Sequence, residues 1–269
     1  MAQSTTQVLK SLNHNFSSSA IGMSLTEAGL LVDRSEAIVR LYAQYHSWTE
    51  VKERWHAERI HERGSRSSAQ RIFRIIKRRL QAGGSALPSI STLHNLVQQC
   101  PTAQAKAQLF YFYLIQEDGL FRFVLHEVLR QQGIDRDRWD LSPATIESTV
   151  RAFHYENGSA LKYADSTLSR WVQGFRSVLV DIGVLKRPYD KQGTVPTIDL
   201  PPLHVASLYS WNKEGKKWLE QPTGLFYLFQ PRSYREALLG RIASSDQWAR
   251  SKVRDQEMLV PAETEMTTK

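Results

Sequence analysis

One segment of the chain combines helical spacing with an unusual charge. Residues 63–79 hold seven basic side chains in seventeen positions and no acidic one. On a helix, at about 100° per residue, positions three and four apart share one face, and the apolar stripe contains Ala69, Ile72, Phe73, Ile76 and Leu80. Arg71, Arg74 and Arg78 fall on the opposite side. The segment therefore predicts a helix that packs along one face and presents cations on the other.

The positive charge of the chain is concentrated in the same region. The whole chain has 35 Lys+Arg and 27 Asp+Glu, a formal charge of +8. Residues 34–82 alone hold twelve basic and five acidic residues, a difference of +7. A plain solvated helix face is the alternative interpretation, but such faces usually mix both signs. A local excess of one sign favours an anionic partner, most often a phosphate backbone.

Two helices are predicted ahead of the basic one. The first starts near residues 33–36 and is supported by the spacing of Ile38, Leu41, Tyr42 and Tyr45. Residues 47–50 have the form of a capping box, so the second starts at Trp48. It is expected to end near His61, because Gly64 favours a left-handed helix end. Its buried side is expected to contain Trp48, Val51 and Trp55.

The basic helix is expected to be capped by Ser65 or Ser67 and to stop at residues 83–84. Three short helices with a glycine-containing turn before the third predict a helix-turn-helix arrangement. In that motif the third helix enters the major groove of DNA, where its side chains reach phosphates and base edges. The nucleic-acid-binding residues predicted here are Arg63, Arg66, Ser67, Ser68, Gln70, Arg71, Arg74, Lys77 and Arg78.

A second helical unit is predicted in the C-terminal half. Residues 102–116 and 119–132 are dense with large apolar side chains and predict a core helix hairpin, followed by a helix starting at Ser142-Pro143. Residues 166–182 have a strong apolar stripe, and residues 194–200 alternate like a strand. A long helix followed by a short strand pair outlines a winged helix, with Ser169, Arg170 and Gln173 facing the groove. Arg170 and Gln173 are included as nucleic-acid-binding residues; a purely structural helix is the alternative.

The region after residue 205 gives weaker signals. Leu225–Phe229 is interpreted as a strand, and residues 233–236 as a capping box that opens a terminal helix to about Arg250. Trp211, Trp218 and Trp248 are expected to anchor this region onto the rest of the protein.

The predicted fold is mainly α, with helix-turn-helix and winged-helix-like units joined by a helical core and a small β element in the C-terminal half. Four parts are expected: a flexible N-terminal tail over 1–24, a helical domain with the helix-turn-helix over 25–135, a winged-helix-like domain over 136–250, and a disordered tail over 251–269.

The sequence lacks the motifs of common enzymes. It has no phosphate-binding glycine loop and no dinucleotide-binding turn. Its histidines are scattered and it has one cysteine, Cys100, so no metal-ligand pattern is legible. We therefore expect a protein without catalytic residues, metal or cofactor. The single cysteine and the lack of a leader or a membrane-spanning run favour the cytoplasm.

Several stretches resemble the BrxA family, small proteins of bacteriophage-exclusion (BREX) defence systems. The most specific motif is Arg66-Ser67-Ser68-Ala69-Gln70-Arg71. Supporting similarity lies in residues 35–42, 48, 72–73, 108–111, 123–124, 166–168 and 183–185. The resemblance covers about residues 25–200.

The resemblance implies a non-catalytic component that binds double-stranded DNA beside a methyltransferase, an ATPase and a phosphatase-like protein. The family is also similar to the RNA-binding antitermination factor NusB, which makes RNA the second candidate ligand. A third interpretation is an interaction scaffold whose basic helix docks onto an acidic protein.

Overall fold

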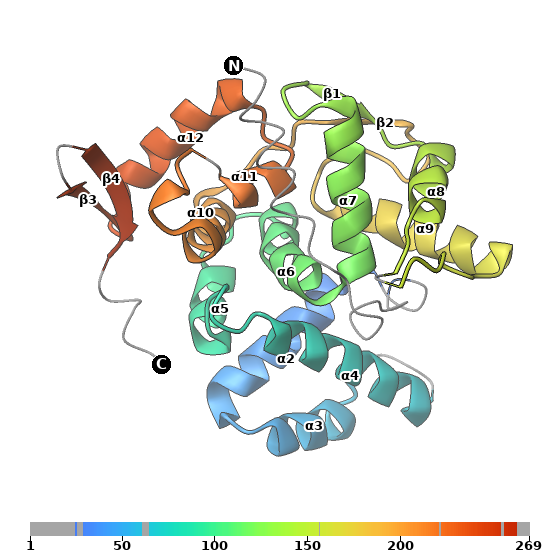
Figure 1. Ribbon diagram of the computed structural model, residues 1–269. Helices are drawn as coiled ribbons and strands as arrows, with labels where there is room; N and C mark the ends of the chain where they lie inside the picture. The colour runs from blue at the N-terminus through green and yellow to red at the C-terminus, as the bar shows by residue number, and fades with distance from the viewer. Residues whose placement is uncertain are drawn as a thin grey trace.

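The computed structural model describes residues 25, 29–60, 65–155, 157–220, 222–253 and 256–262. Its N-terminal unit contains α2 (Val32–Tyr45), α3 (Trp48–Ala57) and α4 (Arg66–Ala82). They lie at the bottom of the view in Figure 1, with α3 packed against both α2 and α4. The sequence predicts these three helices in this order, and the structure confirms them. The tail predicted over residues 1–24 lies outside the described residues.

Helix α3 begins as predicted and ends earlier. The Ser47 hydroxyl accepts from the backbone N–H of Glu50 at 3.4 Å, so the predicted cap is present. Val51 and Trp55 are buried, and Trp48 is partly buried. The helix ends at Ala57, short of His61, because Arg59 adopts a left-handed backbone conformation (φ 52°) that does not continue a helix.

The centre of the molecule is the helix hairpin formed by α6 (Ala103–Glu117) and α7 (Gly119–Gln132), which follow α5 (Ile90–Gln98). Every residue of α6 from Ala107 to Ile115 is buried, because other helices surround it. Figure 1 shows it between the N-terminal helices and α10, and it packs against α2, α4, α5, α7, α9 and α10. The predicted core hairpin is therefore confirmed.

The second unit contains α8 (Pro143–Arg151) and α9 (Asp165–Asp181), flanked by the strands β1 (Arg138–Asp140) and β2 (Gln192–Thr194). β1 and β2 pair in antiparallel fashion. The predicted strand pair after the long helix is thus arranged differently, because the partner of β2 comes before α8. The strand predicted over 194–200 is also wrong, because β2 ends at Thr194 and the next helix begins at Leu200. Pro201 and Pro202 fit the first turn of that helix, where a backbone N–H is not needed.

The chain after residue 199 is mostly helical. It contains α10 (Leu200–Glu214), the short 3-10 helix η3 (Gly215–Lys217), α11 (Thr223–Tyr227) and α12 (Arg232–Ala243). The strand predicted over Leu225–Phe229 is wrong, because these residues form most of α11 and the turn after it. All five are buried. In a short apolar run that is buried on every side, the sequence shows no alternation of apolar and polar residues that would distinguish a strand from a helix.

The C-terminal end corrects two further predictions. The terminal helix stops at Ala243 instead of about Arg250, and it begins at Arg232 with no side-chain cap, so residues 233–236 are not a capping box. The chain forms a hairpin that extends into the segment predicted to be disordered, residues 251–269: β3 (Trp248–Val253) pairs with β4 (Gln256–Pro261). The hairpin lies beside α12 at the left edge of Figure 1.

Tryptophans anchor this region, as predicted. Trp218 and Trp248 are buried with ring centroids 5.0 Å apart, and Trp211 is partly buried. Trp248 Nε1 donates to His204 Nδ1 at 2.8 Å, and Trp218 Nε1 donates to the carbonyl of Leu259 at 3.0 Å. Both indoles therefore bury their apolar rings and satisfy their N–H groups against the hairpin and α10.

The buried apolar side chains form one cluster from Leu25 to Leu259. The predicted boundary at residues 135/136 lies between α7 and β1, and Leu129 and Trp139 on its two sides both belong to this cluster. The helices α6 and α7 thus connect the N-terminal unit with α8 and α9. No described helix combines the length and the apolar sequence that crossing a bilayer requires.

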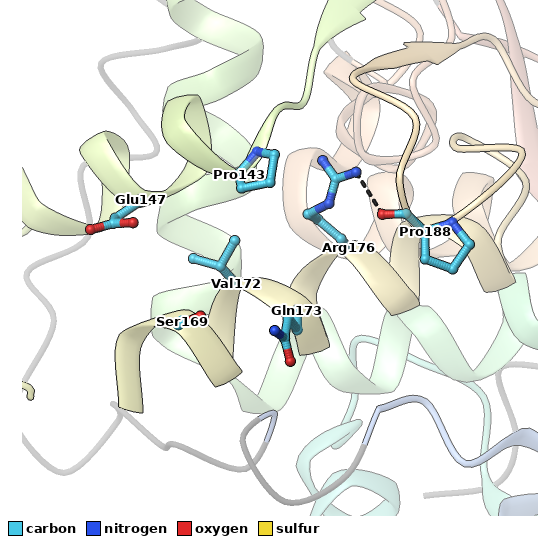
Figure 2. A pocket seen from close by; sticks show the side chains of 7 residues that line it. All are labelled: Pro143, Glu147, Ser169, Val172, Gln173, Arg176 and Pro188. Atoms are coloured by element: carbon cyan, nitrogen blue, oxygen red, sulfur yellow. Dashed lines mark hydrogen bonds between the residues drawn. The ribbon is translucent and has the colours of Figure 1, made fainter. Parts of the chain in front are cut away.

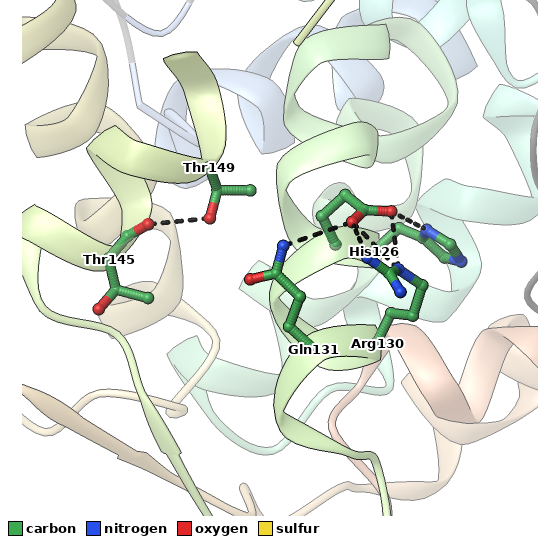
Figure 3. Close-up of polar contacts among 6 residues, drawn as sticks. His126, Arg130, Gln131, Thr145 and Thr149 are labelled. Carbon is green, nitrogen blue, oxygen red and sulfur yellow. Dashed lines mark hydrogen bonds and ion pairs between the residues drawn. The ribbon is translucent and has the colours of Figure 1, made fainter. Parts of the chain in front are cut away.

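A polar cluster lies on α7, between buried His126 and exposed Arg130. The side chains of His126, Arg130 and Gln131, which Figure 3 labels, all contact the carboxylate of Glu127. Arg130 Nη2 donates to it at 2.7 Å, and His126 Nδ1 lies 3.6 Å away. The His126 contact and then the Arg130 hydrogen bonds hold the pKa of Glu127 at about 2, below its usual 4.5. The carboxylate is therefore ionised at neutral pH.

Candidate nucleic-acid interface

Helix α4 begins at the position that its sequence favours. The hydroxyl of Ser65 accepts from the backbone N–H of Ser68 at 3.2 Å, which identifies Ser65 as the capping residue. The helix ends at Ala82, and Gly84 follows with a positive φ of 50°. The predicted start and end of the basic helix are confirmed.

Aromatic contacts fix α4 on the protein. Trp55 Nε1 of α3 donates to the carbonyl of Ala69 at 3.1 Å. The ring of Phe73 lies 6.0 Å from the ring of Trp55 and 6.3 Å from that of Trp48, measured between centroids. The whole predicted stripe is buried, and Ile75 and Arg79 are buried as well. α4 is therefore held in one orientation about its axis, and its outer face is defined.

The outer face of α4 contains most of the predicted binding residues. Ser68 and Lys77 are partly buried, and the exposed residues are Arg66, Ser67, Gln70, Arg71, Arg74 and Arg78. Arg63 lies outside the described residues. The outer face of α4 between Arg66 and Arg78 contains no acidic side chain, so its potential is positive along most of its length.

The basic side chains in the C-terminal part of α4 contact other segments of the protein. Arg78 Nε lies 2.6 Å from Glu117 Oε1, and the ammonium of Lys77 lies 5.2 Å from the ring centroid of Trp48. Arg79 Nη1 donates to the carbonyl of Gly29 at 2.7 Å. Burial lowers the pKa of Arg79 to about 10, although Glu117 raises it, so this side chain is still charged at neutral pH. These contacts attach α4 to α6 and to the chain ahead of α2.

Glu117 and Arg79 are parts of this site that the sequence interpretation missed. Arg79 stands seven residues after Ile72, so the helical period alone places it on the buried stripe. Glu117 gave no comparable signal. Its side chain is 9% exposed and meets Arg78 from another helix, a contact that only the packing of α4 on α6 creates.

Helix α9 presents the second group of predicted residues. Ser169, Arg170 and Gln173 are exposed on it, as expected from the apolar stripe on its other side. This stripe packs in the core. On successive turns of the helix, Trp171, Phe175 and Leu179 are each 0% exposed. The stacking of Trp171 on Phe175, with ring centroids 5.3 Å apart, fixes the rotation of α9.

A pocket of about 220 Å³ lies beside the exposed face of α9. Figure 2 shows its lining residues, which come from α8, α9 and the loop before β2: Pro143, Glu147, Ser169, Val172, Gln173, Arg176 and Pro188. Arg176 is buried at 4% exposure. Its guanidinium donates to the carbonyl of Leu141, and to those of Pro188 at 2.7 Å and Asp190 at 2.6 Å.

The predicted residues therefore form two groups. Nearly all lie on α4, while Arg170 and Gln173 lie on α9, and Figure 1 shows the two helices apart from each other. Both belong to the half of the view that is opposite the β3–β4 hairpin. In the part of the chain that the structure describes, no three His, Cys, Asp or Glu side chains gather as a set of metal ligands.

These features define a mainly helical protein whose N-terminal unit presents a basic outer helix. The family model for BrxA matches residues 22–201, which is more than half of the chain and includes both α4 and α9. The chain belongs to the BrxA family, and this membership indicates a role associated with BREX defence. No curated protein matches the chain.

Proposed function

We propose that this protein is a non-catalytic, double-stranded-DNA-binding component of a BREX-type defence system. The observation that supports this most directly is the outer face of α4, where Arg66, Arg71 and Arg74 are exposed on a helix without acidic residues. A row of guanidinium groups along one helix suits the phosphates of a duplex, since each neutralised phosphate releases bound counterions.

Helix α9 supplies a second contact in this proposal, through Arg170 and Gln173. The defence partners would be a methyltransferase, an ATPase and a phosphatase-like protein, and the compartment the cytoplasm. The proposal includes no chemistry by the protein itself: it positions DNA for these partners, and α4 contributes most of the affinity through phosphate contacts.

The test compares duplex DNA, single-stranded DNA and duplex RNA in one electrophoretic-shift series. In the double variant Arg66→Glu/Arg74→Glu we expect duplex-DNA affinity to fall at least about 100-fold, because two phosphate contacts become repulsive. Both side chains are exposed, and an acid at the first position of a helix is favourable. The fold should therefore be unchanged by circular dichroism.

The matched control is Lys216→Glu/Lys217→Glu, which makes the same change in net charge on exposed residues of η3. It should lower affinity by no more than a few-fold. Equal losses in both double variants would show that net charge, not the α4 face, governs binding. Wild-type affinity in the α4 variant would contradict the proposed interface, and a preference for duplex RNA would favour the NusB-like function.

A further inference from the structure

The pocket beside α9 has walls suited to an apolar group and an edge suited to hydrogen bonding. Pro143, Val172 and Pro188 contribute the apolar walls, and Ser169 and Gln173 stand on the exposed face of α9 at its edge. In Figure 2 the side chains of Pro143, Val172 and Pro188 lie around that of Arg176, with Gln173 below them. A volume of about 220 Å³ accommodates a methyl group or a small ring.

Buried Arg176 fixes both sides of this pocket. One of its amino groups donates to the carbonyl of Leu141, two residues before Pro143, and the other donates to the carbonyl of Pro188 itself. A single guanidinium thus holds the start of α8 and the loop before β2 at a set separation. The pocket is therefore formed before any ligand arrives, which reduces the entropy cost of binding.

The lining does not suit a phosphate. The donors of Arg176 are directed to three backbone carbonyls, and Glu147 places a carboxylate at the rim, paired with Arg151 at 2.7 Å. An anion would meet this acid and the apolar walls. A neutral group with a methyl substituent and a hydrogen-bonding edge matches the pocket better. The base edges of a duplex provide such groups, and thymine alone among the DNA bases has a methyl group in the major groove.

We propose that this pocket and Gln173 read one A·T base pair. The Gln173 amide offers one donor and one acceptor, which match N7 and the amino group of adenine, whereas guanine offers two acceptors that suit arginine. The thymine methyl of the same pair enters the apolar pocket. This inference rests on the proposed function, and it adds base preference at α9 to the phosphate contacts of α4.

The test begins with duplexes enriched by the wild-type protein from a random library. One position should prefer A·T by about five- to tenfold, the low end of what one bidentate pair provides. Replacing that thymine by uracil removes only the methyl group, and replacing the adenine by 7-deazaadenine removes only the N7 acceptor. Each replacement should lower wild-type affinity by about three- to fivefold.

Gln173→Ala should lose the response to 7-deazaadenine and most of the A·T preference, so that its affinity for the selected duplex approaches its affinity for random duplexes. Ser177→Ala, at an exposed position one turn further along α9, is the control and should keep both. The inference is overturned if the A·T preference persists in Gln173→Ala, or if the wild-type protein shows no preference at any position. In either case, binding of random duplexes by the wild-type protein would still support the proposed function. Failure of wild type to bind any duplex would reject both.

Discussion

Glu117 is the residue that most directly limits the charge on the outer face of α4. It lies 2.6 Å from Arg78, whose side chain is 55% exposed and therefore within reach of a ligand. Glu117→Gln should retain an acceptor for Arg78 but remove the competing charge. We expect duplex-DNA affinity to rise about two- to fivefold and the slope of log K against log salt to steepen by about 0.9, as for one more phosphate contact. Fluorescence anisotropy at four salt concentrations measures both quantities.

A control must separate the effect of losing the Arg78–Glu117 ion pair from the effect of losing any ion pair between helices. Glu36 pairs with Lys106 at 2.9 Å, and Glu36→Gln breaks that pair between α2 and α6 without changing a contact of α4. Its salt slope should equal that of wild type. If Glu117→Gln binds duplex DNA no better than Glu36→Gln does, Arg78 serves α4 as a structural anchor only, and the binding surface is confined to the first three turns of the helix.

At the scale of elements, α4 depends on its buried ring for its orientation. Phe73 is 3% exposed between Trp48 and Trp55. Phe73→Ala removes this packing and leaves a cavity under the helix, so the free energy of unfolding should fall by about 3–5 kcal/mol. Urea denaturation followed by tryptophan fluorescence measures this change. The control is Gln70→Ala, on the exposed face of the same helix, which should change the free energy of unfolding by less than about 0.5 kcal/mol. Similar values for the two variants would show that the α3–α4 contact contributes little to stability.

The elements that the sequence predicts well are those with a solvent-exposed side. The apolar positions of α4 and α9 recur with the helical period. Ser65 caps α4 and Ser142 caps α8 through their hydroxyl groups. α11 gave no such period, because all of its residues are buried. The β3–β4 hairpin was missed because Trp248 is fixed by His204, a contact across 44 residues that no local pattern reports. The pocket beside α9 was missed for the same reason, since Arg176 assembles it from three separate segments.

For the whole molecule, the position of the charge predicts how binding responds to salt. The chain has a formal charge of +8, and residues 34–82 account for +7 of it. With Arg78 paired to Glu117, the face of α4 is expected to contact about four phosphates, and log K should fall with log salt at a slope of roughly −4. Random duplexes of equal length should compete within about tenfold, since phosphate contacts do not distinguish sequences. Titrations between about 50 and 200 mM salt provide the check. A flat response would contradict phosphate binding and favour the scaffold interpretation, in which α4 docks onto an acidic protein surface.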